Sequence, residues 1–190
     1  MKYRTIVADP PWAYAEGWPT DSTSERSAFR RPGVAVNTRR RSALPYPSMT
    51  VDSISALPVS DMAEDDAHLF LWTTNRYLRQ SYAVVEAWGF RPSQILTWCK
   101  SRRGIGPGGL FSSTSEFVVY ARRGKPSHTS RFDSTWFELP RAEHSRKPDA
   151  FLDIVEGLVS GPYLEMFARR QRLGWDTWGN EALNHVEMPS

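Results

Sequence analysis

The sequence predicts an α/β fold with a largely parallel sheet. Short apolar runs alternate with stretches of helical period, and no internal repeat is visible. The chain has 190 residues, 40% of them hydrophobic, which is enough for one domain (1–190) with its own core. No apolar run approaches the ~20 residues that cross a bilayer, and the first residues do not read as a signal peptide. A single cysteine excludes an intrachain disulfide framework and fits a reducing cytoplasm.

The predicted elements follow one another along the chain. Asn75 is the expected cap of a helix that stops at Gly89, and a second helix is expected from about Asp149 to Val159, with Pro148 near its first turn. Apolar runs predict the strands, and these span residues 5–9, about 68–73, 94–100, 115–123, 162–169 and, as a short closing strand, 174–180. Helices on both faces of the sheet complete the prediction.

Two segments do not fit this alternation. Residues 13–45 are rich in Ser, Thr, Arg, Gly and Pro, and we expect a mobile insert around 15–42. Residues 101–115 are glycine-rich and lie between two predicted strands. Their GIGPGG formally fits a dinucleotide motif, but a proline removes an amide donor and a strand follows, so a flexible loop is the better interpretation.

The stretch IVADPPWAY ends the first predicted strand in an acid and two prolines. Proline disfavours helix in the residue before it, so Asp9 and Pro10 are expected to be extended and stiff. The Asp9 carboxylate and the Pro10 carbonyl are two acceptors, and Trp12 offers a flat face, which suits a flat group that bears an NH₂. The alternative is a strand-terminal turn with Trp12 packed in the core.

Several stretches together resemble one family. ADPPW after a first strand resembles the catalytic motif of amino-methyltransferases that use S-adenosylmethionine. In the same order the chain contains LPYPSMTVDSI, HLFLWTTN, SEFVVYARRGKP, HSRKPD, YLEMFARR and GWDTWGNE. Over nearly its whole length the chain therefore resembles the MTA-70 (MT-A70) family, N6-adenine methyltransferases related to the catalytic subunit of the mRNA methylation enzyme, and the prokaryotic or phage members in particular.

The resemblance implies a Rossmann-like methyltransferase fold in permuted order, with the catalytic strand first and the cofactor strand late. It assigns catalysis to the Asp9, Pro10, Pro11 and Trp12 motif. Asp9 and the Pro10 carbonyl would hold both N–H bonds of the adenine amine, and would orient its lone pair at the sulfonium methyl. Tyr46 matches a position beside the target adenine, although a surface turn between two prolines is an equal alternative for it.

The cofactor residues also come from the resemblance. It places Asp9 and Lys147 near the methionine part of S-adenosylmethionine and Glu165 at the ribose hydroxyls, with Arg169 four residues later. Asn180 and Glu181 match positions that close over the nucleoside. For the lysine and the arginine the alternative is a solvated charge.

The chain departs from the family after Arg169. The best-known members have a His-Asn pair where this chain has Gln171 and Arg172, so the contacts of these two residues are open. The four histidines have no metal-ligand spacing, and no metal site is predicted.

Three functions are consistent with these residues. An active N6-adenine methyltransferase is favoured, because the acid, both prolines and the tryptophan are all present. An inactive nucleic-acid-binding partner of an active enzyme could lose them. Methylation of cytosine or of a small molecule fits the motif alone, but not the full-length resemblance. DNA is favoured over RNA as the substrate, because the chain is short and carries no recognisable reader domain. A homodimer or a heterodimer stays open.

The arginines of the insert generate a first prediction. Arg39, Arg40 and Arg41 are interpreted as phosphate contacts, so replacing all three with alanine should weaken binding to every nucleic acid sequence alike. The salt dependence should flatten by about one log-log unit per lost contact, with cofactor affinity unchanged. Fluorescence anisotropy over a salt series measures both effects. Wild-type affinity with an unaltered slope would leave the insert as a solvated loop.

Overall fold

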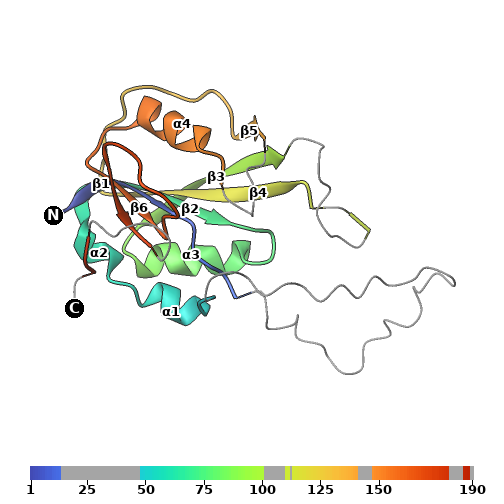
Figure 1. Ribbon diagram of the computed structural model, residues 1–190, viewed down its shortest axis with the longest axis horizontal. Helices are drawn as coiled ribbons and strands as arrows, with labels where there is room; N and C mark the ends of the chain where they lie inside the picture. Colours follow the sequence, from blue (N-terminus) through green and yellow to red (C-terminus); the bar gives the residue numbers. More distant parts are fainter. Residues whose placement is uncertain (14–47, 101–109, 112, 141–146, 180–185, 189–190) are drawn as a thin grey trace, which may run out of the picture.

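A computed structural model describes residues 1–13, 48–100, 110–111, 113–140, 147–179 and 186–188. The predicted insert at 15–42 lies outside these ranges, as does most of the glycine-rich stretch at 101–115. The elements follow one another in the order shown in Figure 1: β1 (Tyr3–Ala8), α1 (Val51–Ser55), α2 (Val59–Met62), β2 (Ala63–Thr73), α3 (Leu78–Ala87), β3 (Arg91–Lys100), β4 (Ser115–Arg123), β5 (Trp136–Leu139), α4 (Ala150–Leu158), β6 (Tyr163–Met166) and β7 (Trp175–Trp178).

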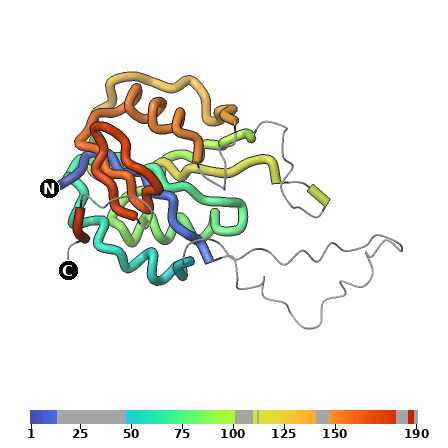
Figure 2. Tube along the Cα trace, viewed as in Figure 1, coloured from blue at the N-terminus to red at the C-terminus, as the bar shows by residue number. Residues whose placement is uncertain are grey.

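The described strands form one seven-stranded sheet in the order β5-β3-β4-β2-β1-β6-β7. β1 pairs in parallel with β2 and β6, as do β6 with β7 and β3 with β5. Only β4 among them is antiparallel to its neighbours, β2 and β3. The predicted α/β fold with a largely parallel sheet is therefore confirmed. Figure 2 shows the first strand, in blue, beside the late strand β6, in red.

Side chains of the strands alternate between two cores, one on each face of the sheet. On one face Leu69 and Leu71 pack with residues of α1, α2 and α3. On the other face Phe70 and Trp72 pack with Phe151 and its neighbours in α4. Figure 1 shows α4 on the opposite side of the sheet from α1 and α3. The second half of β2 is buried on both faces of the sheet, which explains why its residues 69–72 are consecutively apolar.

Three of the short elements, β5, α1 and α2, were not predicted. β5, α1 and α2 are four or five residues long, and such lengths are too short to show a periodicity. α1 begins where the Thr50 hydroxyl accepts a hydrogen bond from the backbone N–H of Ser53 at 3.1 Å. The prediction that Asn75 caps the next helix is wrong, because α3 begins at Leu78 after Tyr77, which makes no side-chain cap bond. Gly89 ends that helix region at φ +79°, as predicted.

The connections run over opposite faces of the sheet. The chain reaches β2 from β1 through α1 and α2, and reaches β6 from β5 through α4. β2 and β6 flank β1, so the order of the strands reverses beside β1. In open α/β sheets ligands bind beyond the carboxyl ends of the strands at such a point. None of the described helices is both long and apolar enough to span a membrane.

Candidate active site

A pocket lies at the carboxyl ends of β1, β2 and β6, on the face that α4 covers. Its cavity volume is about 30 Å³. It is lined by Val7, Asp9, Trp72, Lys147, Pro148, Phe151, Leu152, Glu165, Phe167, Arg169 and Arg170. Asp9, Lys147, Glu165 and Arg169 were predicted from the sequence, and the fold brings all four together.

The alternation of the strands directs these side chains. Val7 belongs to the core under α4, so Asp9, two residues further on, faces the same side of the sheet. On β6, Leu164 and Met166 belong to the opposite core, and Glu165 between them therefore faces the pocket. Glu165 thus lies at the pocket because of its position in the alternation of side chains along β6.

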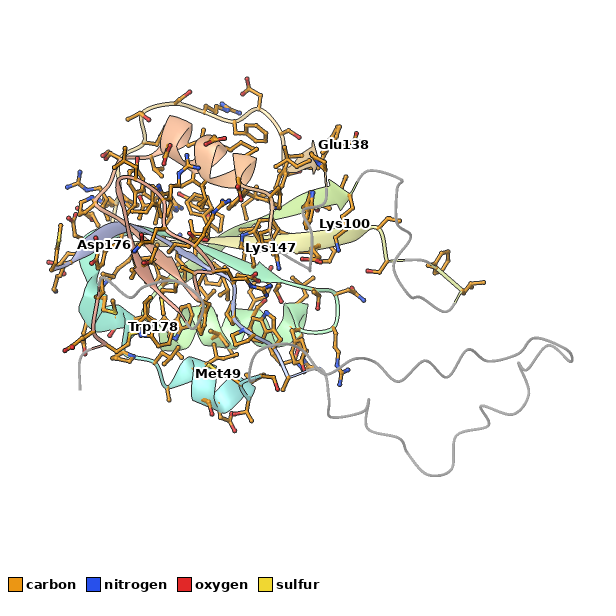
Figure 3. All side chains as sticks on the ribbon, in the orientation of Figure 1. Met49, Lys100, Glu138, Lys147, Asp176 and Trp178 are labelled. Carbon is orange, nitrogen blue, oxygen red and sulfur yellow. The ribbon has the colours of Figure 1, made fainter. Side chains whose placement is uncertain are left out.

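Four charged side chains alternate in sign along this edge of the sheet. Lys147 Nζ lies 2.8 Å from Asp9 Oδ1 and 3.0 Å from Asp9 Oδ2. The same ammonium lies 3.3 Å from Glu116 Oε2, and Glu116 in turn forms an ion pair with Lys100. The four side chains are only 11–23% exposed. Figure 3 shows Lys147 and Lys100 along the same edge. We call this arrangement the charge ladder.

Opposite charges in the ladder outweigh the cost of its burial. Burial alone would lower the pKa of Lys147, but Asp9 and Glu116 raise it above its ordinary value. Burial alone would raise the pKa of Glu116, but Lys147 and Lys100 hold it below its ordinary value. Lys147 and Glu116 are therefore both charged at neutral pH. The Lys147 ammonium also lies 5.4 Å from the centre of the Trp72 ring, which adds a cation–π contact.

The motif loop, residues 9–12, is held in place by backbone hydrogen bonds. The Pro10 carbonyl accepts the Trp12 amide at 2.9 Å, and the Pro11 carbonyl accepts the Met49 amide at 2.8 Å. A carbonyl oxygen has two lone pairs, so within the described part of the chain the Pro10 carbonyl has one more acceptor site than the Trp12 amide uses. Trp12 forms a parallel bridge with Met49, so the chain on both sides of residues 14–47 returns to the motif.

Trp12 occupies the place that the alternative interpretation gave it. Its side chain is 3% exposed, and its indole Nε1–H donates to the Trp72 carbonyl at 3.2 Å. Its ring stacks on Tyr77, with centroids 5.1 Å apart, and the Tyr77 hydroxyl donates to the Ala13 carbonyl. Burial in the core under α3 makes Trp12 a support of the loop, which corrects the expectation of an indole face presented to a base.

Sequence reasoning missed Glu116 and Lys100. β3 runs parallel to β1 and ends at Lys100, whereas the antiparallel β4 begins near Glu116 at the same edge. Trp98 and Val118 belong to the core under α4, so the period of two directs Lys100 and Glu116 to that face. The available signal was a lysine at the end of one predicted strand and a glutamate near the start of the next. Using that signal required knowing that β4 is antiparallel.

Other predicted residues lie outside the described part of the chain. These are the substrate candidates Tyr46, Arg39, Arg40 and Arg41 and the cofactor candidates Asn180 and Glu181. Their roles stay predictions.

His68 is a structural residue. It is 1% exposed, with Nδ1 3.0 Å from the Tyr120 hydroxyl and Nε2 2.9 Å from the Ser127 carbonyl. Burial lowers its pKa, which favours the neutral ring. Among the residues that the structure describes, no group of three or more His, Cys, Asp or Glu side chains is placed to hold a metal ion.

A family model described as MT-A70 matches residues 3–181. The chain belongs to the MT-A70 family. It is 32% identical over 197 residues to the Type II methyltransferase M.MunI of a Mycoplasma species, a comparison that covers all of this chain and 82% of that relative. Family and relative alike make it a methyltransferase.

Two eukaryotic relatives are longer. The N(6)-adenosine-methyltransferase MT-A70-like protein of Arabidopsis thaliana is 28% identical over 76% of this chain, which spans 22% of that relative. The human N(6)-adenosine-methyltransferase catalytic subunit METTL3 is 24% identical over 95% of this chain, which spans 28% of that relative. The similarity therefore covers about a quarter of these two proteins.

The ladder generates a stability prediction. Replacing Lys147 with methionine leaves Asp9 and Glu116 facing each other without their shared cation, which should cost about 3–5 kcal/mol in unfolding free energy at pH 7. The pKa of Glu116 is depressed in the folded wild type, so the stability linked to it is present above its unfolded pKa and is lost as pH falls. The loss caused by Lys147→Met should therefore shrink below about pH 4.

Urea unfolding at pH 7 and at pH 3.5 measures this difference. Arg131→Met is the matched control, because the Arg131–Asp133 pair is 86% and 88% exposed and should contribute within about 0.5 kcal/mol. Equal stability of Lys147→Met and wild type at pH 7 would contradict the stabilising role assigned to the charge ladder.

Proposed function

We propose that this MT-A70 methyltransferase transfers a methyl group from S-adenosylmethionine to the N6 amine of adenine in nucleic acid, with DNA favoured over RNA. One observation carries the proposal: Asp9, Lys147, Glu165 and Arg169, which lie far apart in the sequence, line one pocket at the carboxyl edge of the sheet. Supporting it, the pocket lies beside β1 where the strand order reverses, which is where Rossmann-like sheets bind their ligands.

The chemistry of the side chains that line the pocket fits this cofactor. The Glu165 carboxylate suits the ribose hydroxyls, and the Lys147 ammonium, just before α4, suits the methionine carboxylate. Trp72, Phe151 and Leu152 supply apolar wall. When bound, S-adenosylmethionine would supply an electrophilic methyl group on a sulfonium sulfur. The chain supplies the position, the charge and the exclusion of water around it.

The residues of the motif loop would activate the amine. The exocyclic nitrogen of adenine is a weak nucleophile, because its lone pair is delocalised into the ring. The Asp9 carboxylate has more acceptor sites than Lys147 uses, and within the described part of the chain the Pro10 carbonyl has one more than the Trp12 amide uses. Accepting both N–H bonds there would orient the nitrogen lone pair and stabilise the positive charge that grows on it.

Lys147 would hold the Asp9 carboxylate in one orientation, because both carboxylate oxygens lie within 3.0 Å of the ammonium. The amine must also lose a proton in the reaction. The Asp9 carboxylate is the proposed acceptor, and its side chain is 23% exposed, which allows the proton to pass to water.

The choice of nucleic acid rests on likeness of sequence. The chain is 32% identical to a relative named Type II methyltransferase, against 28% and 24% for two relatives named for N(6)-adenosine. We therefore put DNA first and RNA second. An inactive nucleic-acid-binding partner is a weaker candidate, because Asp9 is present and is fixed by Lys147. Methyl transfer from tritiated S-adenosylmethionine to duplex DNA, single-stranded DNA and RNA, followed by identification of the methylated nucleoside, tests all of these together.

Asp9 is expected to be essential. Asp9→Ala, and the isosteric Asp9→Asn, should reduce methyl transfer to below about a tenth of wild-type turnover, at least ~1.4 kcal/mol on the barrier. The fold should survive because Lys147 retains Glu116 as a partner. Asp133→Asn, on the exposed Arg131–Asp133 pair, is the matched control and should keep full activity. Turnover above that tenth in either Asp9 variant would rule out the assigned role.

Glu165 is expected to act on cofactor affinity. Glu165→Gln should weaken binding of S-adenosylhomocysteine by about tenfold or more, because charge-assisted hydrogen bonds contribute roughly 1.5–3 kcal/mol. Nucleic acid affinity should change little. Titration calorimetry measures the cofactor affinity, with Glu138→Gln on the exposed edge of β5 as control. An unchanged dissociation constant in a folded Glu165→Gln protein would sink the assignment.

A further inference from the structure

The connection between β6 and β7 is unusually short. The two strands are parallel neighbours, yet only residues 167–174 join them. Parallel neighbours normally need a crossover of a dozen or more residues, most often with a helix that packs on the sheet. This connection, which we call the β6–β7 loop, contains no helix. It also carries Phe167, Arg169 and Arg170, which line the pocket, so whatever holds the loop in place also shapes the pocket.

Arginines of the loop attach it to one face of α4. Arg172 Nε donates to Glu156 Oε1 at 2.9 Å, and Arg172 Nη2 lies 2.8 Å from Glu156 Oε2, a bidentate pair. The same Nη2 reaches Asp153 Oδ1 at 2.5 Å, and Arg170 forms an ion pair with Asp149. Asp149, Asp153 and Glu156 are spaced at i, i+4 and i+7, so they share one face of the helix.

A third group orients Glu156. The indole Nε1–H of Trp175, the first residue of β7, donates to Glu156 Oε1 at 2.6 Å. The Arg172 carbonyl accepts the Trp175 amide at 3.1 Å. Hydrogen bonds from Arg172 lower the pKa of Glu156 despite opposing desolvation, and the pKa of Arg172 is raised in return. The Arg172–Glu156 pair is therefore charged over the whole physiological pH range.

The tip of the loop has no apolar anchor to replace this pair. Leu173 is 100% exposed, and Gln171 is exposed as well. At its base the loop is fixed to β7, where the Ala168 amide donates to the Trp178 carbonyl at 3.0 Å. Arg172 lies in the tip, between Gln171 and Leu173, but its side chain is only 22% exposed and that of Glu156 34%, so the pair is partly shielded from water.

We propose that Arg172 and Glu156 are positioning residues for cofactor binding: their bidentate pair fixes the β6–β7 loop against α4 and so holds the pocket wall formed by Phe167 and Arg169. The inference rests on the proposed function, since it takes the pocket to be the cofactor site. Arg172 does not itself line the pocket, and its guanidinium is directed to the helix. It acts through the loop and not on the ligand.

A double-mutant cycle with a cofactor readout tests the proposal. Arg172→Gln, Arg172→Lys, Glu156→Gln and the double variant Arg172→Gln with Glu156→Gln are titrated with S-adenosylhomocysteine by calorimetry. Arg172→Gln should raise the dissociation constant by about fivefold or more. Glu156→Gln should do the same, and the double variant should be no weaker than the worse single variant, because the two residues act as one unit. Arg172→Lys keeps the charge without the fork and should recover part of the affinity.

Kinetics separate positioning from a general loss of structure. The KM for S-adenosylmethionine should rise with the dissociation constant, with kcat at saturating cofactor within about twofold of wild type. Arg131→Gln, which breaks the exposed Arg131–Asp133 pair, is the matched control and should change neither value.

Any of four outcomes would overturn the inference. A lower melting temperature of the Arg172 variants with unchanged affinity would make the pair only a structural contact. Weaker cofactor binding by Arg172→Gln with unchanged binding by Glu156→Gln would mean that Arg172 acts on the ligand directly. Additive effects in the double variant would mean that the two residues do not act as one unit. If wild type itself bound no S-adenosylhomocysteine, the proposed cofactor would fail first and the inference would fall with it. If Arg172→Gln does not fold, Arg172→Lys and Glu156→Gln still distinguish these results.

Discussion

Lys147 lies between two carboxylates, and the organisation of the pocket depends on that position. Its ammonium contacts Asp9 at the end of β1 and Glu116 at the start of β4, strands separated by β2 in the sheet. A lysine that is 19% exposed is stable there only because both anions offset its burial. The same contacts orient the Asp9 carboxylate and tie the segment before α4 to the sheet. The contacts that compensate the charge of Lys147 therefore also fix the geometry of the pocket.

The sheet makes this constraint possible through direction and alternation. Strands β1, β2, β3 and β6 end at the same edge, and the antiparallel β4 begins there. With a side-chain period of two, every second residue on these strands faces α4. Acids and lysines at this edge of the sheet thus meet on the face that α4 covers. The rings of Trp72 and Phe151, whose centroids are 4.8 Å apart, form part of the apolar wall of the pocket there. Trp12 is buried in the core on the opposite face of the sheet, and it supports the motif loop from that side.

Helix α4 joins two electrostatic systems. Lys147, directly before it, belongs to the ladder, while Asp149, Asp153 and Glu156 receive the arginines of the β6–β7 loop. The pocket lies between these two sets of contacts, and its apolar wall includes Phe151 and Leu152 from the same helix. The Arg172–Glu156 pair that holds the loop is thus separate from the groups proposed to bind the ligand, whereas Lys147 belongs both to the ladder and to those groups.

The sequence by itself determined the long strands, helices α3 and α4, the α/β class and the family, because apolar period and motif order are local properties of the chain. It also pointed to Asp9, Lys147, Glu165 and Arg169, which carry recognisable neighbours. Only the tertiary structure decided that Trp12 supports the loop, that Glu116 and Lys100 complete the ladder, and that Arg172 turns to α4. These depend on the antiparallel direction of β4 and on contacts between residues 16 to 138 positions apart, which no local pattern encodes.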